Sequence, residues 1–295
     1  MSEVLSQRRW SVEKRLEFIE FQLFWYGGIN RSDIRRKFVV SAQQASADLG
    51  LYHEVAPNNL TYDPRGKRYL ASAGFKPVFG TPESDAFLWQ LRDDVHFLSE
   101  SGGIALQELP SHDIVRLPKR SIDPSILRVV AAAIREGKVI EVLYQSMSAE
   151  TPAQRKISPH AFAFDGHRWH VRAFCHKGMH YKDFLLARIQ EIRVVKGDYI
   201  SGDTDQVWNS FFTLILKPNP KLSKSQSLAV ALDFGMVDMK LHIKMRLAFL
   251  YYFLRRLELQ DCDGEHRDPR EQHVVIDNKK ETKLAIERTL LNNGS

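Results

Sequence analysis

Residues 168–175 restrict the possible folds of this 295-residue chain more than any other segment. Read with the two-residue period of a β-strand, one face carries Trp169, Val171, Ala173 and Cys175, and the other carries Arg168, His170, Arg172 and Phe174. The first face is apolar and typical of a core, whereas the second combines arginine and histidine with an aromatic ring. We interpret the segment as a half-buried strand whose outer face suits a flat anionic ligand such as a nucleotide.

Further strand-like segments surround it at residues 139–146, 155–160 and 181–189, and Asp165-Gly166 predicts a tight turn before it. Together these segments resemble the WYL domain, a small Sm-like or SH3-like β-barrel that senses ligands in bacterial transcription regulators. Of the three residues that give the domain its name, this chain keeps the tryptophan as Trp169, and histidine and valine follow it. The resemblance implies a central ligand-sensing barrel.

The N-terminal residues carry the helix signals of a DNA-binding module. Apolar residues recur at helical spacing over 11–26, with Ser11 as the expected N-cap. Asn30 can cap a second helix, and Ser41 begins a capping-box pattern for a third helix that ends at residues 49–50. Two short helices separated by two valines are a candidate helix-turn-helix.

A β-hairpin is expected next in the chain. Residues 59–62 and 67–70 flank Asp63-Pro64-Arg65-Gly66, which suits a type I turn because proline takes the second place and glycine the fourth. We interpret this hairpin as a wing. Basic side chains collect where winged domains contact phosphates, and short polar side chains begin the third helix, where base edges are read. The residues predicted to bind DNA are Arg31, Arg35, Ser41, Gln43, Gln44, Ser46, Arg65, Lys67 and Arg68.

Three runs of this region, residues 41–49, 57–63 and 67–69, resemble the winged domains of WYL regulators that lie beside phage-defence operons of the BREX and CBASS types. The resemblance covers nearly the whole chain. It implies a sequence-specific transcriptional repressor of a phage-defence operon, which binds a double-stranded operator and responds to a nucleotide or oligonucleotide effector. The residues by themselves also allow a three-helix bundle without a DNA partner.

Side chains of the predicted WYL strands could form one ligand cavity. Arg188 would end an otherwise apolar strand face, and a guanidinium in that place needs an anion or a carboxylate partner. Guanidinium and hydroxyl groups bind phosphates, and aromatic faces stack on bases. The resemblance to WYL domains places the polar members of this set in the family's pocket. The predicted ligand-binding residues are Tyr144, Ser146, His160, Trp169, His170, Arg172, Phe184 and Arg188.

An alternative stays open for the first of these residues, because Tyr144 could be a core residue whose hydroxyl is satisfied locally.

Two capped helices are expected between the winged part and the strands. The first covers residues 81–95, with Thr81 as its cap and Leu88 on its buried side, and the second starts at Asp123-Pro124 and ends at residue 137.

The C-terminal part is expected to form a small α/β element. Its predicted elements are a helix over 203–216, a strand over 228–234, a helix over 244–257, a strand over 273–276 and a helix over 281–291. Four aromatic residues within 249–253 cannot share one helix face, so another element or a second subunit must cover some of them. The family resemblance implies that this element dimerises, and winged dimers usually read an inverted repeat.

The expected architecture is therefore α+β and multidomain, which agrees with the length of the chain. We predict a winged helix-turn-helix domain at residues 1–78, a helical linker region at 79–138, a WYL ligand-sensing domain at 139–202 and the C-terminal dimerisation element at 203–295.

Composition and motifs narrow the class of protein. The net charge of +6 is compatible with nucleic acid but does not identify it. The two cysteines, Cys175 and Cys262, are far apart and indicate a reducing compartment without a disulfide framework. The first residues lack a secretory signal, and the longest apolar run, 247–254, is too short to cross a bilayer. A cytoplasmic protein without a membrane partner is expected.

We expect neither a cofactor nor a metal. The histidines near Cys175 lack the paired spacing of a zinc site, and His170 and Cys175 fall on opposite faces of one strand. The sequence holds no glycine-rich phosphate loop and no GxSxG motif, so an enzyme is not expected. Two alternatives to a repressor remain, namely an Sm-like RNA-binding module and a nucleotide-processing enzyme without a known motif.

Overall fold

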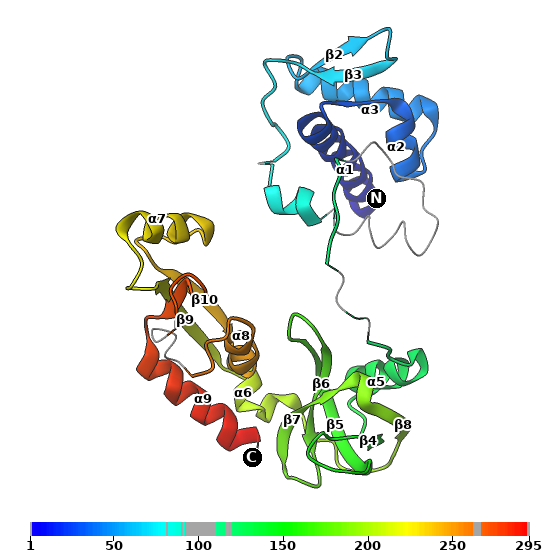
Figure 1. The fold of residues 1–295 in the computed structure, drawn as a ribbon. Coiled ribbons are helices and arrows are strands. Elements are labelled where there is room, and N and C mark those ends of the chain that lie inside the picture. The colour runs from blue at the N-terminus through cyan, green and yellow to red at the C-terminus, as the bar shows by residue number, and fades with distance from the viewer. Residues whose placement is uncertain are drawn as a thin grey trace. The chain divides into compact units, whose positions relative to one another are not determined.

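The computed structural model describes residues 2–80, 82–89, 91, 110–115, 118, 120–261 and 267–293 (Figure 1). The chain divides into two compact units, Met1–Arg116 and Leu117–Ser295. Among the described residues, buried apolar side chains form one core in the first unit and two cores in the second. Each core belongs to one of the functional modules expected from the sequence.

The first unit is a winged helix-turn-helix, as predicted. The hairpin β2–β3 pairs with β1, so the three-stranded antiparallel sheet has the order β1-β3-β2. The core lies between this sheet and the helices, and Ile19, Ile34 and Leu49 are fully buried in it. The elements are α1 (Ser2–Tyr26), β1 (Gly28–Ile29), α2 (Arg31–Phe38), α3 (Ala42–Val55), β2 (Leu60–Asp63) and β3 (Arg68–Ala71).

Two helix boundaries of this unit differ from the prediction. Helix α1 begins at Ser2, so Ser11 lies inside the helix and is not its N-cap. Helix α3 continues through Gly50 to Val55, because Tyr52 is fully buried and its packing outweighs the cost of about 1 kcal/mol for a helical glycine.

The segment after the wing is only partly described. Residues 84–89 are helical, but Leu88 is 57% exposed and the expected buried side is wrong there. Phe87 makes the inward contact instead, since its ring stacks on Trp25 of α1 with the centroids 4.6 Å apart. The expected cap Thr81 and the end of this helix lie outside the described residues.

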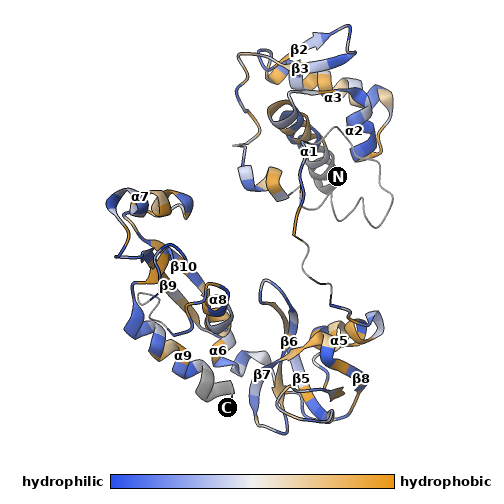
Figure 2. Cartoon of the chain, viewed as in Figure 1, coloured by the Kyte–Doolittle hydropathy of each residue, from blue (hydrophilic) through white to orange (hydrophobic). Residues whose placement is uncertain are grey.

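The second unit begins with α5 (Pro124–Glu136), which is capped by Asp123 at its start and by Gly137, with φ of 60°, at its end, as predicted. It packs on an antiparallel sheet of order β7-β6-β5-β4-β8. Figure 2 shows hydrophobic residues along α5, and Ile126, Val130 and Ala133 of this helix belong to the core. The strands are β4 (Ile140–Tyr144), β5 (Ala153–Phe164), β6 (Trp169–Cys175), β7 (His180–Leu185) and β8 (Ile189–Val194).

The expected closed barrel is not found in this sheet. Strands β7 and β8 are its two edges and are not paired with each other, and a short 3₁₀ turn, η1 (Leu186–Arg188), connects them. Residues Leu186 to Arg188 are therefore a turn and not the end of a strand. The five strands fall within the predicted region, and the Asp165-Gly166 turn is present with φ of 86° at Gly166.

The C-terminal part of the second unit has a core of its own around an antiparallel sheet of order β10-β9-β11. The elements are η2 (Gly202–Thr204), α6 (Gln206–Asn209), β9 (Phe211–Pro218), α7 (Lys224–Asp233), β10 (Leu241–Arg246), η3 (Leu247–Phe249), α8 (Leu250–Arg256), β11 (Val274–Ile276) and α9 (Lys279–Asn293). The strand at 273–276 and the final helix were predicted within a few residues.

Three predictions for this part are wrong. The expected helix over 203–216 is reduced to the short helix α6, and from Phe211 onward the chain is strand β9, in which alternate residues such as Leu214 and Leu216 are buried. The expected strand over 228–234 is helix α7, whose start is set by a capping box between Ser223 and Gln226 that outweighs the alternation of its apolar residues. The expected helix over 244–257 begins as strand β10, and α8 starts only at Leu250.

Candidate nucleic-acid interface and effector site

Two helix caps determine where α3, the helix predicted to contact DNA bases, begins. The Asn30 side chain accepts from the backbone N–H groups of Ser32 at 2.8 Å and Asp33 at 3.2 Å, and the Asp33 carboxylate accepts from Asn30 N at 2.8 Å. Val39 adopts a left-handed φ of 53° after α2, and Ser41 Oγ then accepts from Gln44 N at 3.1 Å. These local bonds connect α2 to α3 through a short turn, which is the geometry of a helix-turn-helix.

The predicted DNA-binding side chains lie on the surface of the first unit. Those on α2, on the first turns of α3 and in the wing are exposed, and Arg68 is half-buried. Arg31 and Ser46 meet across the two helices, since Arg31 Nη1 lies 3.4 Å from Ser46 Oγ. In the wing, Asp63 accepts from Arg65 N at 2.9 Å and from Gly66 N at 3.1 Å, which orders the tip of the hairpin.

A buried ion pair that the sequence did not predict lies beneath α3. Arg15 of α1 donates to both oxygens of Asp48, from Nε at 2.6 Å and from Nη2 at 3.0 Å. Arg15 is 7% exposed and Asp48 is 2% exposed. Gln44 joins the pair from the surface, because its Nε2 donates to Asp48 Oδ1 at 3.0 Å. Residues 33 positions apart give no local signal, so only the helical position of Asp48 at i+4 from Gln44 could have suggested the contact.

The predicted effector residues fall into separate groups. Tyr144 and Phe184 contact each other in an edge-to-face arrangement, with the ring centroids 5.1 Å apart, and Phe184 is a buried core residue. Tyr144 Oη accepts from Leu185 N at 3.1 Å, so its hydroxyl is satisfied locally. Trp169 is half-exposed and packs on Phe164 with the centroids 4.9 Å apart.

Two further predicted residues lie in loops. Ser146 follows β4, and its Oγ is 2.8 Å from Ser148 Oγ. Arg188 is half-buried in turn η1, where its carbonyl accepts from Gln145 N at 3.2 Å. The Ser146 hydroxyl and the Arg188 guanidinium are therefore not on the strand faces to which the sequence pattern assigned them.

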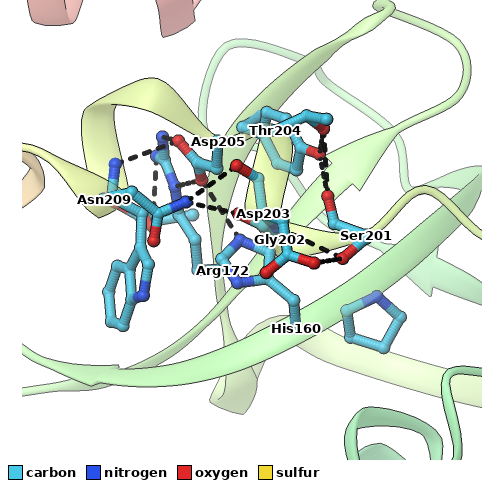
Figure 3. A network of polar contacts seen from close by, with 12 residues as sticks. His160, Arg172, Ser201, Gly202, Asp203, Thr204, Asp205 and Asn209 are labelled. Carbon is cyan, nitrogen blue, oxygen red and sulfur yellow. Dashed lines mark hydrogen bonds and ion pairs between the residues drawn. The ribbon is translucent and has the colours of Figure 1, made fainter.

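His160 and Arg172 come together at a third residue, Asp205 (Figure 3). Arg172 donates to both Asp205 oxygens, from Nε at 2.7 Å and from Nη2 at 3.1 Å. His160 Nε2 lies 3.1 Å from Asp205 Oδ2, and Asp205 also caps α6 by accepting from Trp208 N at 3.0 Å. Arg172 and Asp205 are each 1% exposed. The chain itself thus supplies the carboxylate that pairs with the Arg172 guanidinium.

The neighbouring charges keep this pair ionised. Burial raises the pKa of Asp205, but hydrogen bonds from His160 and Arg172 outweigh it and hold the pKa at about 2. Burial lowers the pKa of the Arg172 guanidinium, but Asp205 and Asp183 outweigh it and raise that pKa above its ordinary value. Asp183 Oδ1 is 3.5 Å from Arg172 Nη1, so two carboxylates surround one guanidinium.

The second half of this face is covered by α8. Tyr252 donates to Asp183 at 2.9 Å, and its ring lies 5.3 Å from the ring of His170. His170 Nε2 is 3.0 Å from Asp165 Oδ2. Burial raises the pKa of Asp165, but the His170 bond and the backbone N–H groups of the turn outweigh it and lower the pKa to about 2.

The outer face of β6 is therefore not exposed, which corrects the reading of residues 168–175 as a half-buried strand. His170 is 5% exposed and Arg172 is 1% exposed, because Tyr252 of α8 packs on His170 and Asp205, the N-cap of α6, pairs with Arg172. The expectation that another element covers some of the aromatics in 249–253 is confirmed by Tyr252, which packs on this face.

In the part of the chain that the structure describes, no group of three or more histidine, cysteine or carboxylate side chains is arranged to hold a metal ion. The same part contains no helix that combines the length and the hydrophobicity needed to span a bilayer.

Comparison with known proteins relates this geometry to a family. The chain is 39% identical over 279 residues to the DNA-binding transcriptional repressor CapW of Stenotrophomonas maltophilia, and the match covers 94% of this chain and 93% of that protein. The chain belongs to the CapW family. Proteins of the same name from Escherichia coli and Pseudomonas aeruginosa are 36% and 37% identical, over 92% and 95% of this chain and 91% and 93% of theirs.

Family models match three segments of the chain. The BrxR transcriptional regulator winged helix-turn-helix domain matches residues 11–93, the WYL domain matches 125–194, and the BrxR C-terminal dimerization domain matches 211–282. The predicted resemblance to WYL regulators of the BREX and CBASS type is thereby confirmed.

Proposed function

We propose that this chain is a DNA-binding transcriptional repressor of a phage-defence operon that acts as a cytoplasmic homodimer. The observation that carries the proposal is the capped α2–α3 pair with its exposed basic and amide side chains, in a chain of the CapW family. The match to a C-terminal dimerization domain supports the dimer. A two-fold dimer of winged units reads an inverted repeat in double-stranded DNA.

Within the interface, two roles divide the side chains. Arg31, Arg35, Arg65, Lys67 and Arg68 contact phosphates, which gives affinity without sequence information. Ser41, Gln43, Gln44 and Ser46 begin α3 and contact base edges in the major groove. The wing tip is ordered by Asp63, so its cations are presented on a defined hairpin.

A comparison of duplexes tests this proposal. The full-length protein is expected to bind a duplex with its inverted repeat about 1,000-fold more tightly than a random duplex of equal length. Gln43→Ala should lower affinity for the specific duplex by ~1–3 kcal/mol and leave random binding nearly unchanged. Equal weakening on both duplexes would mean that α3 does not read bases, and a preference for single-stranded RNA would favour the Sm-like alternative.

We further propose that an anionic group of a nucleotide or oligonucleotide effector binds His160 and Arg172 by displacing the Asp205 carboxylate. The support is that Arg172 and His160 already bind an anion, and that this anion belongs to the chain. Because Asp205 also caps α6, its displacement would loosen the contact between the WYL sheet and the C-terminal element. This change could alter the spacing of the two winged units of a dimer.

Of the remaining predicted residues, exposed Trp169 supplies a stacking surface and Arg188 supplies a second cation near β7. Tyr144 and Phe184 support the sheet from its core. We therefore centre the proposed effector site on His160 and Arg172, because Ser146 contacts Ser148 and His170 contacts Asp165.

Thermal stability tests the effector proposal, because a ligand that binds only the folded state raises the melting temperature. A 5′-phosphorylated single-stranded tetranucleotide is the probe, with the unphosphorylated strand as its control. Asp205→Asn is expected to enlarge the response, since it removes the internal competitor. Arg188→Ala should fold and bind operator, yet respond less. If both variants respond as the wild type does, the effector site lies elsewhere.

A further inference from the structure

The Arg15–Asp48 pair fixes the orientation of the exposed Gln44 side chain on α3, the helix proposed to contact DNA bases. Gln44 Nε2 donates to Asp48 Oδ1 at 3.0 Å, while Arg15 holds both Asp48 oxygens. Gln44 itself is exposed on the first turn of α3. One end of its amide is therefore bonded to a buried group, and the other end faces the region where a base edge would lie.

The chemistry of the carboxylate decides which end of the amide points outward. An ionised carboxylate accepts hydrogen bonds and donates none, so Gln44 must turn its NH₂ group toward Asp48. The carbonyl oxygen Oε1 is then directed away from Asp48, and one N–H of the amide remains. A rotation of the amide by 180° would bring Oε1 against the Asp48 carboxylate, where two acceptors repel each other and lose the hydrogen bond.

We infer that Gln44 is a specificity-determining residue that reads adenine and rejects guanine, and that Arg15 and Asp48 are the positioning residues that set this choice. Adenine presents an N6–H donor beside the N7 acceptor in the major groove, which matches an outward Oε1 and the remaining N–H. Guanine presents only the acceptors O6 and N7, so the outward oxygen would face another oxygen. The inference rests on the proposed binding of DNA through α3.

The neighbouring Gln43 provides the comparison within the same helix. Gln43 is exposed on the same turn, and none of the hydrogen bonds recorded for the described residues fixes its amide. A glutamine that can rotate offers either its oxygen or its NH₂ group to a base, so its discrimination between adenine and guanine is weaker. Gln44 therefore represents base recognition by a fixed amide, and Gln43 represents base recognition by an amide that can rotate.

A scan of single base-pair changes through the operator tests the inference, with the full-length wild type and variants. The base pair that Gln44 contacts is identified as the one at which Gln44→Ala lowers the selectivity of binding. At that pair the wild type should prefer adenine over guanine by about 10-fold to 100-fold. Gln43→Ala should leave this preference unchanged and should lower selectivity at a different base pair.

Asp48→Asn addresses the positioning role directly, because an amide at position 48 can donate and lets Gln44 rotate. The folded variant is expected to lose most of the adenine preference while it retains Gln44. Arg15→Lys keeps the Asp48 carboxylate paired and should keep the preference. If Asp48→Asn does not fold, Gln44→Glu provides the test at the surface, since it removes the donor and should move the preference from adenine to cytosine.

The outcomes separate this inference from the proposed function. A guanine preference at the Gln44 pair, or a full adenine preference in folded Asp48→Asn, would overturn the orienting role while DNA binding stands. The same holds if Gln44→Glu still prefers adenine. If no substitution at Gln43, Gln44 or Arg65 changes duplex binding, the proposed interface itself is wrong.

Discussion

Two buried arginine–aspartate pairs, one in each unit of the molecule, show how similar chemistry serves different purposes. Arg15 and Asp48 connect α1 to α3, and Arg172 and Asp205 connect β6 to the segment before α6. Each pair joins residues 33 positions apart and is bonded through two nitrogens of the arginine. The pairs differ in what surrounds them.

The first pair has one further partner, the exposed amide of Gln44, and balances one positive with one negative charge. The second pair has a second carboxylate, Asp183, together with His160 and Tyr252, so acid is in excess around Arg172. A balanced pair with one surface contact can position a reading residue. Two carboxylates already satisfy the Arg172 guanidinium, so an outside anion would have to displace one of them, as we propose for Asp205.

Removal of Arg172 should produce the largest effect, because Arg172→Leu leaves the buried Asp205 and the half-buried Asp183 carboxylates without their cation. The free energy of unfolding of the second unit is expected to fall by about 3–5 kcal/mol. Urea unfolding of the full chain, followed by tryptophan fluorescence, measures it. The matched control is Arg193→Ala, whose ion pair with Glu141 is at the surface and should cost less than about 1 kcal/mol. A loss no larger than that of the control would show that the Arg172–Asp205 pair does not stabilise the contact between β6 and the segment before α6.

The equivalent change in the winged unit should cost less. Arg15→Leu is expected to destabilise that unit by about 3 kcal/mol, at the lower end of the range for a broken buried pair, since Gln44 still donates to the single carboxylate left behind. Lys14→Ala, which breaks the exposed pair with Glu17, is its control. If Arg15→Leu costs more than Arg172→Leu, the contrast between the two pairs is reversed.

Acid should weaken the second unit in a defined window. The pKa of Asp205 is about 2 in the folded protein and 3.8 ordinarily, so its contribution is fully present above pH 4 and is lost as the pH falls from about 4 to 2. The loss should amount to about 2 kcal/mol. Asp205→Asn should remove this part of the pH dependence. An unaltered acid profile in that variant would show that Asp205 does not carry the effect.

The smallest expected effect lies at the wing. Arg65→Ala should lower the slope of log affinity against log salt concentration by about one unit and weaken specific and random duplexes alike. Lys224→Ala removes the same charge from α7 of the other unit and serves as the control. Equal slopes for the wild type and Arg65→Ala would place this side chain away from the phosphates.

The elements that the sequence predicted well are those whose signals are local. Asn30, Ser41 and Asp123 each cap a helix through bonds to residues two or three positions ahead, so the start of each helix can be read from a few neighbours. The wing was predicted for the same reason, because Asp63 and Gly66 lie within one turn.

The predictions failed where distant segments decide the structure. The alternation in β6 is real, but its outer face is buried by Asp205 and Tyr252, which lie far along the chain. Strand β9 is fixed by pairing with β10 and β11 on its two sides, and no local pattern announces these partners. Both buried ion pairs belong to this class, so the polar groups that position the candidate sites could not be found from the sequence alone.

The most direct test of the repressor account is a selection of genomic DNA fragments on the purified full-length protein. The account predicts that the recovered duplexes share an inverted repeat, and that Gln43→Ala, a change at an exposed side chain, clearly lowers their enrichment. Recovery of duplexes without a common repeat, or equal enrichment by the wild type and this variant, would contradict sequence-specific reading by α3.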